Sequence, residues 1–250
     1  SKAIAVPKFK RPLIICGPKN SSSSNQHIIK FAKNINAPIL ADSLSQMRDY
    51  LPKHNVFSLY EHYLKLISKQ PDIIFRFNGK PTSKKLNSFL DKHRNKTYLI
   101  INHDKHNDDC KNIIKIDIKD INSKIKLKHQ VESDWFKSIL QHETRTSKIL
   151  NKELNKYNFQ GKLFNKSMQK HTKGSHIFIG SSTPIRSLDK FSGYLNNKLK
   201  LLSNHTTRGI DGILSTALGM SYINKINNFL YIGDISFFYD INAFHILNNT

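Results

Sequence analysis

Apolar and polar positions alternate along the first half of the chain in a pattern typical of a layered α/β fold. Five strands are predicted from continuous apolar runs, at residues 12–17, 37–42, 71–77, 97–102 and 112–118. Amphipathic segments at 26–36 and 83–92 predict helices between them. Continuous apolar strands separated by helices favour a mainly parallel sheet covered on both faces. We therefore predict a Rossmann-like central domain over residues 1–130.

The pattern changes after residue 130. Residues 131–173 are polar and lysine-rich with a helical period, which predicts a helical connection. From residue 174 a second α/β pattern begins, with strands predicted at 175–180 and 229–232, a helix with Pro184 in its first turn, and a helix at 213–222. We expect the second of these strands, Phe229-Leu230-Tyr231-Ile232, to be buried and parallel. Residues 174–250 are interpreted as the beginning of a second, incomplete α/β domain.

Charge and cysteine content narrow the class of protein. The 250-residue chain has a formal net charge of +22, but its lysines are scattered, and no nucleic-acid recognition module is present. We therefore expect attraction to small anionic metabolites rather than nucleic acid. No apolar run approaches the roughly 20 residues that span a bilayer, and the amino terminus is not a secretion signal. Two cysteines, Cys16 and Cys110, indicate reduced thiols in a cytoplasmic protein.

Two strand-to-helix corners could bind phosphate. Gly17 and the serines after it follow the first strand, but the Gly-x-Gly-x-x-Gly fingerprint is missing, which favours a plain loop. The second corner is Gly233-Asp234-Ile235-Ser236, where we expect Ser236 to cap a helix. A helix amino terminus attracts phosphate, and an aspartate there can hold a magnesium ion that bridges it. The alternative is that Asp234 is a simple helix cap.

Three corners taken together resemble one enzyme family. They are Gly180-Ser181-Ser182-Thr183-Pro184-Ile185-Arg186, Gly209-Ile210-Asp211-Gly212 and Gly233-Asp234-Ile235-Ser236. They are similar to the thiamine-diphosphate-dependent 2-succinyl-5-enolpyruvyl-6-hydroxy-3-cyclohexene-1-carboxylate synthases of menaquinone biosynthesis. The amino-terminal part is similar to the central domain of that family, at residues 11–17, 39–46, 76–77 and 81–84.

The resemblance implies a central domain followed by the start of a diphosphate-binding domain. The pyrimidine-binding domain of the family, with its catalytic glutamate, has no counterpart in this sequence. We therefore expect no catalytic residue in this chain and no activity from the chain alone. The family's shared cofactor sites imply a homo-oligomer in the complete enzyme.

The resemblance also implies a role for individual residues. Asp234 would be the Mg²⁺ ligand, and Ile210 would hold thiamine diphosphate in its bent shape. The remaining cofactor-binding residues would be Gly209, Gly233, Ile235 and Ser236. The substrate-binding residues would be Ser182, Arg186, Lys84, Lys85 and His205. The implied reaction joins the carbanion from decarboxylated 2-oxoglutarate to isochorismate, and both substrates are anions that arginine binds well.

One departure from the family pattern leaves an alternative open. Where the family usually has Asn-Arg-Gly, this chain has Asn204-His205-Thr206, with an arginine at Arg208 instead. His205 is shorter than arginine and mostly neutral at pH 7. The alternatives are a degenerate, non-catalytic α/β protein and, from the charge of +22, a basic nucleic-acid-binding protein.

Overall fold

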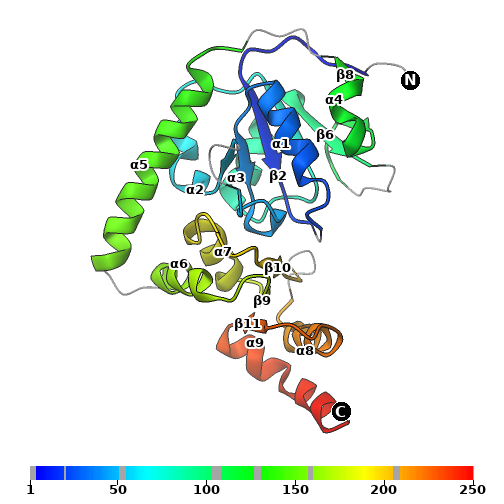
Figure 1. The fold of residues 1–250 in the computed structure, drawn as a ribbon, viewed down its shortest axis with the longest axis vertical. Coiled ribbons are helices and arrows are strands. Elements are labelled where there is room, and N and C mark those ends of the chain that lie inside the picture. Colours follow the sequence, from blue (N-terminus) through cyan, green and yellow to red (C-terminus); the bar gives the residue numbers. More distant parts are fainter. Residues whose placement is uncertain are drawn as a thin grey trace.

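The computed structural model describes residues 4–19, 21–50, 55–102, 108–126, 131–156, 160–204 and 209–249. Figure 1 shows an upper unit built around a large sheet and a lower unit built around a small one. The long helix α5 (Trp135–Lys156) runs along one side of the upper unit and leads to the lower unit. Both sheets are covered by helices, so the predicted α/β fold class is confirmed.

The larger sheet has six parallel strands in the order β4-β3-β2-β5-β6-β7. Its strands are β2 (Pro12–Cys16), β3 (Ile39–Ala41), β4 (Val56–Phe57), β5 (Ile73–Phe77), β6 (Thr97–Ile101) and β7 (Asn112–Lys115). The five predicted strands are present, and the chain order reverses between β2 and β5. Every residue of β2, β3 and β5 is buried, as their continuous apolar runs require.

Helices bury both faces of this sheet. On one face, Ile14, Phe75 and Phe77 pack with Ile28 and Phe31 of α1 (Asn25–Asn34). The helix α4 (Ile121–Lys124) lies on the same side. The opposite face packs against α2 (Tyr60–Tyr63), α3 (Lys84–Lys92) and α5.

The segment that leads to the lower unit is helical in its described residues. It contains α5 and α6 (Gln160–Lys170). Trp135 at the start of α5 is fully buried, and its Nε1 donates a hydrogen bond to the Pro12 carbonyl oxygen at 2.6 Å. The start of α5 is therefore fixed to the first strand of the larger sheet. In the described residues, no helix is long and apolar enough to cross a membrane.

The smaller sheet has three parallel strands in the order β10-β9-β11. They are β9 (His176–Ile179), β10 (Lys200–Leu202) and β11 (Asn228–Tyr231), and they pack with α6, α7 (Thr183–Phe191) and α8 (Ile213–Ile223). The last helix, α9 (Asp234–Tyr239), contacts α8. The parallel strand predicted at residues 229–232 is present as β11, but the expectation that it is buried is wrong. In this part of the chain β11 lies at an edge of the sheet, and Phe229 is 37% exposed.

Short elements complete the described fold. They are β1 (Ile4–Ala5), β8 (Ile125–Lys126), η1 (Ser43–Ser45), η3 (Leu64–Leu66), η4 (Arg94–Lys96), η5 (Ile118–Asp120) and η6 (Ile241–Asn249). β1 and β8 pair with each other in parallel. Cys16 is buried in the sheet and Cys110 is partly buried, and both are free thiols, as predicted.

Candidate functional site

The three corners singled out in the sequence lie at one edge of one sheet. Because β9, β10 and β11 are parallel neighbours, their carboxyl ends point the same way. Gly180 follows β9, Ser203 follows β10 and Gly233 comes two residues after the end of β11. This edge is where open α/β sheets bind ligands. The fold thus brings together three segments, of which the first and the last are about 50 residues apart in the sequence.

The corner after β11 differs from the prediction in one respect. Gly233 is the N-cap of α9, its backbone is extended, and its carbonyl oxygen accepts the first helical hydrogen bond from Phe237 N at 2.9 Å. The prediction that Ser236 caps this helix is therefore wrong. Ser236 is the third residue of α9 and is buried, because the helix begins at Asp234.

The start of α9 is suited to a negatively charged group. The first backbone N–H groups of any α-helix lack an intrahelical partner, and here the N-cap residue, Gly233, has no side chain that could accept from them. No atom lies within 4 Å of the position that a Cβ on Gly233 would take, and Asp234 is exposed. Ile235 is 70% exposed and does not belong to the core.

The corner after β9 brings two predicted substrate-binding residues together. Ser182 is the N-cap of α7 and has a φ of 70°, a conformation that non-glycine residues rarely adopt. Arg186 lies one turn later, and its Nε donates a hydrogen bond to the Ser182 carbonyl oxygen at 3.0 Å. Both side chains are exposed, so the guanidinium retains donors for a ligand.

The corner after β10 leads into α8. Gly212 caps α8 with a φ of 67°, the left-handed region that favours glycine. Ile210 is 37% exposed, and a Cβ on Gly209 would overlap the Asp211 carboxylate. His205 lies outside the described residues, so its predicted role in substrate binding stays a prediction.

A residue without an assigned role in the sequence analysis joins two of these helices. Asp240, just after α9, accepts hydrogen bonds from Ser215 N at 2.8 Å and Ser215 Oγ at 2.9 Å. Ser215 is the third residue of α8, so Asp240 caps α8 from a distance in sequence. No local sequence signal marks such a cap, because the usual signal requires an adjacent residue.

Lys84 and Lys85 lie in the upper unit, apart from Ser182 and Arg186. They are the first residues of α3, whose N-cap Ser83 accepts a hydrogen bond from Leu86 N. Lys85 Nζ donates to the Glu61 carbonyl oxygen at 3.1 Å. Among the described residues, neither lysine has a hydrogen bond or ion pair with Ser182 or Arg186.

The edge has polar groups that a cofactor could use. In the described part of the chain, the buried hydroxyl oxygens of Ser181 and Ser203 have no hydrogen-bond partner. Both follow strands at this edge. The described residues hold no cluster of three or more His, Cys, Asp or Glu side chains that could bind a metal ion, so the role of Asp234 as a metal ligand stays a prediction. A magnesium ion bound here would need further oxygen ligands, such as those of a diphosphate.

Comparison with known proteins identifies the family. Residues 2–179 match a family model described as the middle domain of thiamine pyrophosphate enzymes. The chain belongs to this thiamine pyrophosphate enzyme family. The match extends through the six-stranded sheet, the two connecting helices and β9.

Curated relatives agree with the resemblance. The chain is 30% identical to 2-succinyl-5-enolpyruvyl-6-hydroxy-3-cyclohexene-1-carboxylate synthase of Bacillus cytotoxicus, over 94% of this chain and 42% of the relative. It is 31% identical to the synthase of Geobacillus thermodenitrificans and 28% identical to that of Desulfitobacterium hafniense. The predicted resemblance is thus confirmed over nearly the whole chain. The chain spans less than half the length of these relatives.

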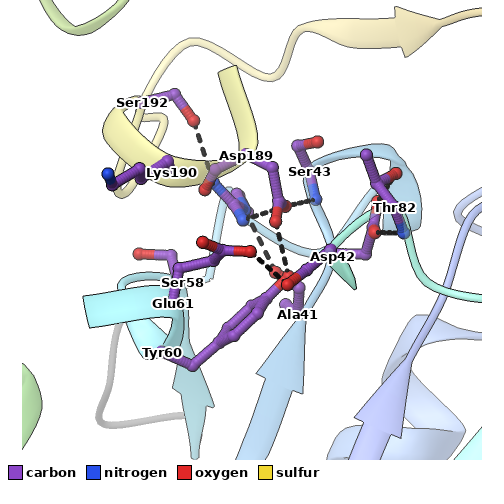
Figure 2. A network of polar contacts seen from close by, with 12 residues as sticks. Ala41, Asp42, Ser43, Ser58, Tyr60, Glu61, Thr82, Asp189, Lys190 and Ser192 are labelled. Atoms are coloured by element: carbon purple, nitrogen blue, oxygen red, sulfur yellow. Dashed lines mark hydrogen bonds and ion pairs between the residues drawn. The ribbon is translucent and has the colours of Figure 1, made fainter. Parts of the chain in front are cut away.

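A buried cluster of charged residues lies where the two units of this thiamine pyrophosphate family member meet (Figure 2). Asp42 follows β3, and Asp189 belongs to α7 of the other unit. Arg48 and Tyr60 contact Asp189, with distances of 2.6 Å from Arg48 Nη2 and 2.8 Å from Tyr60 Oη. All four side chains are nearly inaccessible to solvent. The pattern of apolar positions did not reveal this cluster, although Asp42 lies within residues 39–46, which resemble the central domain of the family.

The cluster should make stability depend on pH. Burial, followed by the nearby Asp189 charge, raises the pKa of Asp42 to about 7, against the lowering effects of two backbone N–H donors and Arg48. A raised carboxyl pKa means that the folded state holds its proton more tightly than the unfolded state. The resulting stability is full below about pH 4 and is lost as the pH rises to about 7.

We therefore expect Asp42→Asn to flatten the fall of the melting temperature between pH 4.5 and pH 7.5. The lowered pKa values of His62, His171 and His176 act in the opposite direction but are unchanged in the variant. Thermal unfolding followed by circular dichroism, with exposed Asp91→Asn as the control, measures the difference. Parallel pH curves for the original chain and Asp42→Asn would show that Asp42 does not titrate in this range.

Proposed function

We propose that this chain is part of a synthase that joins decarboxylated 2-oxoglutarate to isochorismate with thiamine diphosphate and Mg²⁺. The observation that carries the proposal is the meeting of three motifs at the carboxyl edge of the smaller sheet, after β9, β10 and β11. Support also comes from relatives named as this synthase, to which the chain is 28–31% identical over 94–96% of its length.

The residues at this edge suggest a division of labour. Asp234 holds the magnesium ion, while the backbone N–H groups of Gly233, Ile235 and Ser236 bind the diphosphate. Bound thiamine diphosphate supplies the electron sink for loss of carbon dioxide. Gly209 and Ile210 pack against the cofactor.

Substrate carboxylates are held by positive charge and hydroxyl groups. Arg186 offers a planar, two-pronged donor set to a carboxylate, and Ser182 adds a hydroxyl group next to it. Lys84 and Lys85 contribute positive charge from the upper unit. A pyrimidine-binding domain beyond this chain would supply the group that activates the cofactor. We therefore expect the 250 residues alone to be inactive, and the complete enzyme to be a homo-oligomer.

The test is the variant Asp234→Asn, made in the full-length protein as its own cells produce it. Loss of the carboxylate should weaken Mg²⁺-dependent binding of thiamine diphosphate at least about tenfold, since a neutral amide is a poorer magnesium ligand. Calorimetric titration measures the affinity, and consumption of isochorismate with 2-oxoglutarate measures the reaction. Glu153→Gln, a change at a partly exposed position in α5, is the matched control. Full cofactor affinity in Asp234→Asn would remove Asp234 from the metal site.

A further inference from the structure

The segment Asp42–Arg48 is one of the places where the two units contact each other. It leaves the carboxyl end of β3, and Leu44 packs among core residues of the lower unit. Gln46 exchanges hydrogen bonds with the backbone of Leu201, donating at 2.6 Å and accepting at 3.3 Å. The Arg48 carbonyl oxygen accepts from Leu195 N at 2.9 Å. One short segment of the larger sheet's edge thus holds three parts of the lower unit.

Asp42 ties this segment to the start of α3. Its Oδ2 accepts a hydrogen bond from Thr82 N at 2.6 Å, and its Oδ1 accepts from Leu44 N at 2.8 Å. Thr82 directly precedes Ser83, the N-cap of α3. The position of Asp42 therefore sets where α3 begins, and with it Lys84 and Lys85.

Asp189 ties the same segment to α7. Its Oδ1 accepts from Ser43 N at 2.8 Å and from Arg48 Nη2 at 2.6 Å, while its Oδ2 accepts from Tyr60 Oη at 2.8 Å. Arg48 also donates to the Asp189 carbonyl oxygen and to Ser192 Oγ. Figure 2 shows Asp42 and Asp189 on either side of the turn that contains Ser43.

Asp189 is on the same helix as Ser182 and Arg186. Asp189 is three positions after Arg186, which is just under one helical turn, and α7 is a single uninterrupted helix from Thr183 to Phe191. Fixing Asp189 therefore fixes the direction in which the amino-terminal end of α7 presents Ser182 and Arg186.

We propose that the cluster of Asp42, Arg48, Tyr60 and Asp189 is a positioning device that holds α7 and α3 in a set relation. The substrate-binding role of the residues on these helices rests on the proposed function. The mechanical coupling between the two helices does not depend on that function. Two carboxylates share one turn, through Ser43 N and Leu44 N, and each holds a different helix. A shift of either carboxylate is transmitted to the other helix through that turn.

The polar character of the cluster suits this role. Hydrogen bonds to carboxylates are directional, whereas apolar contacts of equal area allow sliding. Glu61 and Lys190 border the cluster in Figure 2, and Lys190 also packs over Phe191. One guanidinium faces two buried carboxyl groups, and burial with the nearby Asp189 charge raises the pKa of Asp42, which is a costly arrangement for a purely stabilising contact.

Amide hydrogen exchange of the intact chain tests the coupling. In Asp189→Asn we expect exchange to rise about tenfold in α7 and also at residues 82–87, although Asp189 does not contact Thr82. Asp42→Asn should give the reciprocal result, with faster exchange in α7. Tyr60→Phe removes only the hydroxyl that donates to Asp189, and it should produce a smaller rise at the same two places.

The control is Asp49→Asn, the same chemical change at the same interface outside the cluster. Among the described residues, Asp49 interacts with Lys198 and has no hydrogen bond or ion pair with α7 or α3, so exchange in α7 and at residues 82–87 should stay unchanged. Strands β5 and β6 should be unaffected in every variant. Faster exchange confined to the mutated element in both Asp189→Asn and Tyr60→Phe would overturn the proposal. This result would leave the proposed synthase function intact, because that function is judged by cofactor binding and turnover.

Discussion

Replacing Arg48 with methionine is expected to destabilise the chain by about 3–5 kcal/mol, the usual cost of breaking a buried ion pair from one side. The Arg48 and Asp189 side chains are only 1% and 2% exposed. Methionine fills similar space but removes the charge and the hydrogen bonds to Ala41 O, Asp189 and Ser192. Asp189 then remains buried without its guanidinium partner. Chemical denaturation with urea, followed by tryptophan fluorescence of Trp135, measures the loss.

Two comparisons make this prediction specific. Arg11→Met breaks an ion pair with Glu132 whose side chains are 29% and 24% exposed, and it should cost only about 1 kcal/mol or less. The double variant Arg48→Met with Asp189→Leu should cost less than the sum of the two single changes, because no unpaired charge remains. If Arg48→Met lowered the free energy of unfolding no more than Arg11→Met does, the buried ion pair would not stabilise the chain as its geometry suggests.

Sequence patterning predicted most of the larger sheet because its strands are buried on both faces. Such strands are continuous apolar runs, and β2, β5 and β6 stand out for this reason. The short strands β4 and β10 could not be predicted. They have two and three residues, too few for any period to be visible.

The candidate site was predictable where motifs follow strands. The corners after β9 and β11 were found because glycine, serine and aspartate mark the ends of apolar runs, and parallel pairing then places them at one edge. The cap was assigned wrongly to Ser236, because capping depends on the backbone of Gly233, which side-chain chemistry does not reveal. The exposure of β11 depends on which other elements pack against it, and the apolar pattern of the strand itself does not contain this information.

The buried cluster shows the limit of sequence patterns. Asp42 and Asp189 are separated by 147 positions, so no spacing rule connects them. Polar residues in apolar surroundings are usually expected at the surface. Only the packing of α7 against the β3 edge turns these two aspartates into a shared, buried group.

Gly17→Ala is expected to destabilise the chain by about 3 kcal/mol or more, at the upper end of the cost of overpacking a core. Gly17 directly follows β2, and its N–H donates to the Phe77 carbonyl oxygen of the neighbouring β5 at 3.0 Å. A Cβ on Gly17 would overlap the carbonyl oxygen of Gly79 and lie 2.8 Å from its carbonyl carbon. Both are backbone atoms, so a side-chain rotation cannot relieve the overlap.

The close approach also explains why a glycine stands at this loop without a dinucleotide fingerprint. The carboxyl ends of β2 and β5 mark the reversal of strand order, the usual place for a ligand crevice, but here the two backbones meet. Gly219→Ala is the matched control. No atom lies within 4 Å of its added Cβ in α8, so it should stabilise the chain by about 0.5–1 kcal/mol. If thermal unfolding gave Gly17→Ala and Gly219→Ala the same melting temperature, the ends of β2 and β5 would be able to separate at little cost in free energy.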